Sequence, residues 1–288
     1  MRNHCCLALC VFLFAPRAEA GWPDDLTLSM MGSYNDSVVD QSVSSASYNY
    51  LVNEMGMAIA NKPVAPAETL GVNGFDVGLN SSFSFVHARQ GDDSDATPWQ
   101  RSHVDADPSS VVWIPSLTAR KGLPGSLEFG TNLGYVGFSR QGVFGGFGRV
   151  GLVEGYRKLP DVTVQAGYSG YFGNPELELG VMDLSVSVGY TMGFGLISGI
   201  NQATFSPFGG IGTFRLHAAP LLPEADAESM GIERVSGFAG TDYYDEQFKH
   251  TVFHAGFALV HDAIQFRMAG QFALGGVSSA NVGLGFNY

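Results

Sequence analysis

Cysteine is almost missing from this sequence, and the three cysteines present (Cys5, Cys6 and Cys10) all lie within the first ten residues. The rest of the chain can therefore form neither a disulfide framework nor a thiolate metal site. After residue 20 the chain also has no apolar run of about 18 residues, which excludes a transmembrane helix. A chain without disulfides must obtain its stability elsewhere, and closure of a β-sheet into a barrel is a sufficient source.

Basic residues are scarce as well. The chain has 15 Lys and Arg against 27 Asp and Glu. Residues 1–20 hold Arg2, Arg17 and Glu19, so 13 basic and 26 acidic residues remain beyond them, a net charge of −13. This sign argues against a nucleic-acid partner. The 38 glycines and 21 phenylalanines favour many short β elements with aromatic surfaces.

Residues 1–20 have the pattern of a cleavable signal peptide. Arg2 and His4 form a weakly basic start, Leu7 to Phe14 is a short apolar core, and Ala18-Glu-Ala20 is an A-x-A cleavage site. The apolar core is too short to span a bilayer as a helix. We therefore expect export through the inner membrane and exclude this segment from the fold.

The last eight residues, 281–288, alternate strictly. One parity is apolar and the other is small or polar, which predicts a β-strand with one apolar face. Because the chain stops there, the free edge of this strand needs a distant partner, and the first long strand is the natural candidate. The apolar parity consists of Val282, Leu284, Phe286 and Tyr288.

The same alternation recurs along residues 70–288 and predicts an all-β fold. We expect an antiparallel up-and-down transmembrane β-barrel of about ten strands (eight to twelve). Pro115 predicts a bulge or local break in the second strand. A soluble β-sandwich is the alternative, but the two long polar connections, 88–108 and 218–247, would both lie at one end of a barrel, while the turns at 121–125, 155–161 and 262–263 would lie at the other. The predicted strands are 70–86, 110–120, 127–135, 143–154, 162–172, 177–192, 204–217, 248–261, 264–274 and 281–288.

An amphipathic helix is predicted ahead of the barrel, at residues 47–60 within an N-terminal periplasmic or lumenal segment, 21–69. Tyr48, Leu51 and Met55 recur at helical spacing, and Asn61-Lys-Pro63 ends the pattern. The helix could plug the lumen, gate the periplasmic side, or simply cap the lower mouth of the barrel, and periodicity alone does not choose among these.

The polar parity of the strands supplies the candidate lumen-lining residues. The charged ones could pair and close the pore, or line a polar path. His250 and His254 would lie about 13 Å apart on a strand, too far to share one metal ion. The glycines of 142–148 precede a strand rather than a helix, so they do not form a phosphate loop. No cofactor is expected. The candidates are Asp76, Asn80, Glu128, Asn132, Gln165, Asp183, His250, His254, Gln265, Arg267 and Gln271.

The leader, the alternating strands and the terminal aromatic strand resemble Gram-negative outer-membrane β-barrel proteins, over roughly residues 70–288. The resemblance implies insertion in the outer membrane among lipid and lipopolysaccharide. It also implies that the barrel assembly machinery reads Phe286 and Tyr288. A helix ahead of the first strand resembles porin-like and fatty-acid-transporter-type barrels, in which the N-terminus plugs the pore.

Three functional hypotheses follow. The first is a passive channel or transporter for a small or amphipathic solute, gated by the N-terminal helix. The second is a structural or surface-interaction protein that acts through its acidic extracellular loops. The third is a barrel-borne lipid hydrolase, but no Gly-x-Ser-x-Gly nucleophile elbow is present, and we expect no enzyme.

Overall fold

The computed structural model describes residues 25–32, 41–88, 96–103, 108–156, 159–197, 200–237, 251–273 and 276–288, without the side chains of 41–43 and 194–202. The predicted signal peptide, 1–20, lies outside the described residues. So does His250.

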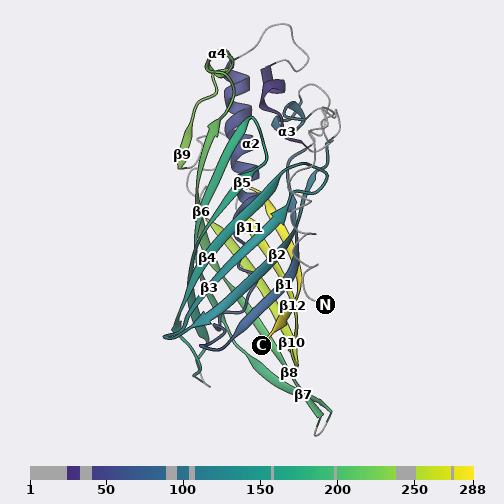
Figure 1. Cartoon of the computed structure of the whole chain (residues 1–288), viewed down its shortest axis with the longest axis vertical. Coiled ribbons are helices and arrows are strands. Elements are labelled where there is room, and N and C mark those ends of the chain that lie inside the picture. Colours follow the sequence, from purple (N-terminus) through teal and green to yellow (C-terminus); the bar gives the residue numbers. More distant parts are fainter. Residues whose placement is uncertain are drawn as a thin grey trace, which may run out of the picture.

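Ten antiparallel strands form a closed ring, which confirms the predicted fold class and strand number (Figure 1). Strands β1 to β6 follow in sequence order, β8 pairs with both β6 and β10, and β12 returns to pair with β1. The ring strands are β1 (Phe75–Phe85), β2 (Val111–Leu123), β3 (Leu127–Tyr135), β4 (Gly142–Val153), β5 (Asp161–Phe172), β6 (Leu177–Gly189), β8 (Ile200–Pro220), β10 (Val252–His261), β11 (Ile264–Ala273) and β12 (Ser278–Asn287).

Among the described residues, two further strands lie outside the ring. Strand β7 (Met192–Ile197) forms a hairpin with the first residues of β8, which projects below the barrel in Figure 1. Strand β9 (Val235–Gly237) pairs with the last residues of β8. Neither was predicted. We call the end of the barrel with the connections after β1 and β8 the long-loop end, and the end where the chain leaves β12 the short-turn end.

The side chains divide as the period-two pattern predicted. Leu79 is 68% exposed on the outside of β1, while Asp76, three residues earlier and of the opposite parity, is 0% exposed on the inside. A stacked sandwich would bury Phe83, Val186 and Leu284 together. These three residues are instead 36%, 38% and 58% exposed on the outer surface. The soluble alternative is therefore wrong, and the apolar outer face is the one that lipid requires.

Some predicted boundaries were wrong. Strand β1 begins at Phe75 rather than at residue 70, because a turn precedes it in which Gly71 has a φ of +70° and accepts a hydrogen bond from Gly74. Pro115 gives a local break rather than a bulge: the β1–β2 register runs past it unbroken, whereas the β2–β3 ladder ends beside it, at Ser116. The register shift lies instead in β4, between Gly151 and Val153.

In the described ranges, four short or medium helices accompany the barrel: η2 (Leu28–Gly32), α2 (Gln41–Ile59), α3 (Pro98–Arg101) and α4 (Glu224–Ser229). Helix α2 matches the predicted helix but begins six residues earlier, at Gln41, because its first turns lack the apolar spacing that marks the rest. The Lys62 ammonium donates to the carbonyls of Met57 and Ala58 and so caps its C-terminus. No helix in the described ranges is long and apolar enough to cross a membrane.

The interior has two different halves. At the long-loop end, α2 packs against η2, α3, β5, β6 and β8, and its buried residues Leu51, Val52 and Met55 join an apolar core. Towards the short-turn end the interior side chains are polar and charged. The barrel is thus closed by an apolar body at one end and by polar contacts at the other.

Candidate functional site: a filled barrel lumen

The N-terminal segment is attached to the rim of the long-loop end. The Asp25 carboxylate accepts from the backbone and guanidinium of Arg140, both at 2.8 Å, in the β3–β4 connection. Ser29 donates to Glu176 between β5 and β6, at 2.9 Å from its backbone and 2.8 Å from its hydroxyl. Since α2 follows this rim and ends among the strands, the chain enters the lumen from the long-loop end.

The connector, residues 60–74, then runs through the lumen to the short-turn end. The Asn61 amide donates to Asp183 of β6 at 2.9 Å and accepts from Asn132 of β3 at 2.7 Å. Further along, Thr69 donates to Glu154 through its backbone (2.6 Å) and hydroxyl (2.7 Å). Strand β1 begins just beyond, so the connector fills the lumen as an internal plug.

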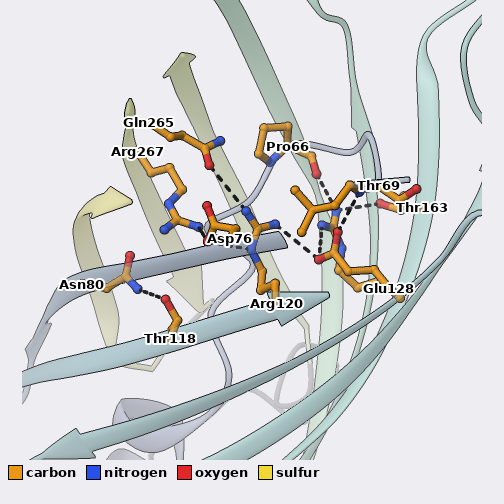
Figure 2. A network of polar contacts seen from close by, with 12 residues as sticks. Pro66, Thr69, Asp76, Asn80, Thr118, Arg120, Glu128, Thr163, Gln265 and Arg267 are labelled. Carbon is orange, nitrogen blue, oxygen red and sulfur yellow. Dashed lines mark hydrogen bonds and ion pairs between the residues drawn. The ribbon is translucent and has the colours of Figure 1, made fainter. Parts of the chain in front are cut away.

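A buried ion network surrounds the lower connector (Figure 2). The Arg120 guanidinium lies 3.2 Å from Asp76 and 3.3 Å from Glu128. Arg149 adds a second contact to Glu128 at 3.1 Å, and Arg267 a second contact to Asp76 at 3.1 Å. All five side chains are at most 4% exposed, so each charge depends on the others for compensation.

The connector is part of this network. The carbonyl of Pro66 accepts from Arg149, and the backbone amide of Leu70 donates to Glu128 at 3.2 Å. Both contacts use the backbone of the connector, so they fix its path without requiring particular side chains at these two positions. The wall arginine and carboxylate thus hold the plug in place.

Two small cavities flank the connector. One, of about 60 Å³, lies towards β1, β2 and β3 and is lined by Lys62, Asn80, Ser116 and Asn132. The other, of about 20 Å³, lies towards β6, β8, β10 and β11 and includes Asp183, His254 and Gln271. Spaces of this size hold one or a few water molecules. They do not leave room for a solute.

The remaining predicted lumen residues lie on the inner face but do not form one cluster. Asn80 donates to Thr118 at 2.7 Å, and Gln265 accepts from Arg120 at 3.5 Å. Gln165 is buried in β5. Asp183 binds Asn61 and stands apart from the Asp76–Glu128 network. The structure therefore distributes these residues over several small groups along the connector.

A serine–histidine contact also occurs in the wall. The Ser187 hydroxyl lies 2.9 Å from Nε2 of His254, and both residues are 4% exposed. Nucleophilic catalysis would need a third group to orient the imidazole and space for a substrate carbonyl. Within the described ranges, no carboxylate contacts His254. This pair satisfies two buried polar groups, and no three His, Cys, Asp or Glu side chains in the described ranges gather to hold a metal ion.

Outside the strands, a contact between a histidine and a glutamate attaches α2 to the end of β1. Nδ1 of His87 lies 2.6 Å from Oε1 of Glu54, which also accepts the His87 backbone amide at 3.0 Å. The hydrogen bond to Glu54 raises the pKa of His87, against a smaller opposing effect of burial. Glu54 itself is 0% exposed within the apolar core. A buried carboxylate thus depends on an imidazole that is 58% exposed.

Sequence reasoning missed several residues that complete the site. Arg120 stands on the polar parity of its strand, so the alternation could have identified it. Arg149 lies in β4, whose glycine-rich sequence left its faces ambiguous. Asn61 and Lys62 mark only the end of a helical pattern in the sequence, because nothing in their spacing reveals that the connector passes through the barrel.

A closed antiparallel ring with an apolar exterior and a polar, filled interior defines a transmembrane β-barrel of the outer-membrane type. No family model matches the chain, and no curated protein matches it by sequence.

Three solved structures are among those to which this chain is similar. Ail, the attachment invasion locus protein of Yersinia pestis, is 10% identical and covers 75% of this chain and 99% of its own, with a TM-score of 0.26. Omp33 of Acinetobacter baumannii is 11% identical, and the match covers 76% of this chain and 99% of Omp33, with a TM-score of 0.28. The N-terminal barrel domain of Pseudomonas aeruginosa OprF is 12% identical, and the match covers 76% of this chain and 99% of that domain, with a TM-score of 0.18. The assignment to the class rests on the geometry above rather than on these scores.

Proposed function

We propose that this protein is an outer-membrane channel for a small or amphipathic solute, closed by its own N-terminal segment. The observation that carries the proposal is the course of residues 60–74 through the lumen, from the end of α2 to the short-turn end. Conduction requires this connector to leave its path, and the barrel then provides a passive route.

The wall behind the connector supports the proposal. In the lower lumen it carries buried charges of both signs, among them Asp76, Glu128 and Arg149, and these groups would face water if the connector left. A wall of this kind suits hydrated solutes better than a dry aliphatic one. The connector is held here by polar contacts, among them those of Pro66 with Arg149 and of Thr69 with Glu154, whereas α2 is held by an apolar core. The lower connector is therefore the part that moves, with α2 as its anchor.

The orientation follows from the loops. Outer-membrane barrels place longer loops outside the cell and short turns in the periplasm. The long-loop end, with α2, α3 and α4, is then the extracellular end, and the terminal strand ends in the periplasm. The gate is thus fixed at the cell surface and opens towards the periplasm.

A reversible cross-link tests the gate. A β-carbon placed on Gly167 would lie 2.6 Å from the Asn61 amide nitrogen, so an Asn61→Cys/Gly167→Cys pair should form a disulfide between connector and wall. No other cysteine occurs after residue 10. In planar-bilayer recordings we expect occasional openings of the wild-type protein, none from the oxidised pair, and their return on reduction.

Two controls complete this test. Asn61→Cys alone should respond to neither oxidant nor reductant, and a chain without residues 21–66 should conduct continuously. Silence of both the wild type and the shortened chain, or equal conductance of the oxidised and reduced pair, would contradict the proposal. Heat-modifiable migration on detergent gels verifies that each variant has folded.

The extracellular end supports a second candidate, a surface-interaction role. Helix α4 presents exposed carboxylates, and it is fixed to the barrel by the buried residues Met230 and Ile232 that follow it. The test is a triple variant that removes three charges in and after this helix, Glu224→Gln, Asp226→Asn and Glu233→Gln. Because all three side chains are exposed, we expect the variant to fold. It should weaken envelope integrity, measured as increased dye uptake by whole cells. Unchanged uptake would count against this role.

A further inference from the structure

One basic residue faces outward from the apolar band. Arg215 of β8 is exposed and alternates with the inward residues Phe214 and Leu216. Within the described part of the chain it makes no hydrogen bond or ion pair. The only other outward-facing Lys or Arg in the described ring strands, Lys121, lies at the opposite end and donates to the carbonyls of Val72 and Gly74. Among the described residues, Arg215 is therefore an unpaired cation on a lipid-facing wall.

Its height along the barrel can be estimated from the strand. Near the short-turn end, Phe205 belongs to an outer aromatic cluster, with ring centroids 5.6 Å from Phe257, which is itself 6.2 Å from Phe266. Arg215 lies ten residues further along β8. At ~3.3 Å per residue and a tilt of about 40°, this separation is roughly 25 Å along the membrane normal, the height of the apolar band.

Arg215 thus lies at the outer boundary of the hydrocarbon. An arginine at the midplane would be destabilising, whereas one at the boundary is tolerated and can reach the lipid headgroups. A guanidinium at this depth matches a phosphate group, because its planar fork of donors binds two oxygens at once.

An open groove of about 740 Å³ adjoins this residue on the outer wall. It is lined by Ala166 of β5, Met182 and Leu184 of β6, and Thr213 and Arg215 of β8. Small residues explain the depression. Across the strands, Thr213 pairs with Leu184, Leu184 pairs with Ala166, and Ala166 pairs with Gly148 of β4, so three of these four positions carry small side chains or none. Elsewhere the same band carries large side chains such as Phe144 and Tyr168.

We propose that this groove is a binding site for lipopolysaccharide, with an acyl chain of lipid A in the groove and a lipid A phosphate on Arg215. The apolar lining fits the chain, and the cation at the headgroup end fits the phosphate. The choice of lipopolysaccharide rests on the orientation given under the proposed function, which places Arg215 in the outer leaflet. The site is separate from the lumen and does not depend on conduction.

Binding of defined lipids to the purified, folded protein tests the site. Bis-phosphorylated lipid A, dephosphorylated lipid A and phosphatidylglycerol are each titrated and followed by native mass spectrometry. Arg215→Ala should weaken binding of bis-phosphorylated lipid A about tenfold, because a charge-assisted contact is lost, and leave dephosphorylated lipid A unchanged. Ala166→Phe, which fills the groove, should weaken both forms of lipid A.

The matched control is Lys121→Ala, which removes an outward cation at the other end and should change nothing. Arg215→Gln retains a polar side chain, so if Arg215→Ala fails to fold, this variant should show the same loss for the phosphorylated lipid alone. Equal binding by wild type and Arg215 variants, or phosphatidylglycerol binding as tight as lipid A, would overturn the proposal.

A separate measurement distinguishes this failure from that of the channel. A cysteine introduced by Glu224→Cys should react with a membrane-impermeant maleimide on intact cells if the long-loop end is extracellular. Labelling together with absent lipid selectivity would overturn the lipid site alone. Absent labelling would overturn the orientation, and with it the choice of lipid, while the cross-linking recordings would still decide on the gate.

Discussion

Single side chains in the lower lumen matter because they are buried charges in a mutually compensating set. Glu128 receives hydrogen bonds from Arg120, Arg149 and the backbone of Leu70. Glu128→Ala leaves two buried guanidinium groups short of an anion and should destabilise the protein by about 3–5 kcal/mol. The measurement is the urea midpoint of heat-modifiable migration. Glu178→Ala, which removes an exposed carboxylate, should change stability by no more than about 0.5 kcal/mol, and equal effects of the two would refute the network.

The pair of Glu54 and His87 predicts a pH dependence. The pKa of His87 is raised in the folded state. The contribution of the protonated imidazole to the free energy of unfolding is therefore complete below the unfolded pKa of about 6.5, and it disappears as the pH rises through the folded pKa. Since the imidazole is 58% exposed, the effect should be small, about 0.2–1 kcal/mol. Hydrogen exchange of α2 should therefore be slower at pH 5.5 than at 8.5, after correction for intrinsic rates.

Glu54→Gln is the control for this effect. It retains an acceptor for His87 but removes the negative charge, so protection of α2 should lose its dependence on pH in the same interval. A dependence that persists in Glu54→Gln would show that another group is responsible.

At the level of elements, the seam between β1 and β12 depends on glycine. A β-carbon on Gly78 would lie 2.4 Å from Nη2 of Arg267 and 2.9 Å from the carbonyl oxygen of Leu284. Gly78→Ala should destabilise the barrel by about 1–3 kcal/mol, because a buried arginine and a neighbouring backbone would both have to move. Gly148→Ala in β4, where a β-carbon meets open space, should be close to neutral. Similar urea midpoints for the two variants would show that the seam does not depend on the glycine at position 78.

The sequence predicts strands well here because a membrane barrel imposes a simple rule. Each crossing must be apolar outside, so residues such as Leu79 and Leu284 reveal the register directly. The rule fails where an element does not face lipid: β7 and β9 lie outside the ring, and the first turns of α2 lack apolar spacing. The site was only partly predictable, since Asp76, Glu128 and Arg267 follow from alternation, whereas Asn61 takes part through a path that no local pattern encodes.

For the whole molecule, ring closure concentrates at the C-terminal strand. Phe75 and Tyr288 exchange backbone hydrogen bonds of 2.7 and 2.8 Å, and Phe286 is 54% exposed on the outer wall. If Phe286 is part of an assembly signal, Phe286→Ser should reduce the amount of folded barrel in the outer membrane more than Phe272→Ser does. Phe272 is 55% exposed and is an equivalent aromatic outside the terminal strand. Equal yields from cell fractionation would argue against such a signal.

The passage of the chain through its own ring has a consequence for the order of folding. A segment that fills the lumen and continues into β1 would have to thread its whole N-terminal part, including helix α2, through a ring that was already closed, whereas the gate moves only the connector and leaves α2 in place. We therefore expect the N-terminal part to lie between the strands before β12 pairs with β1. Refolding in which residues 25–74 are added as a separate peptide to a completed barrel should then fail to reproduce the native arrangement.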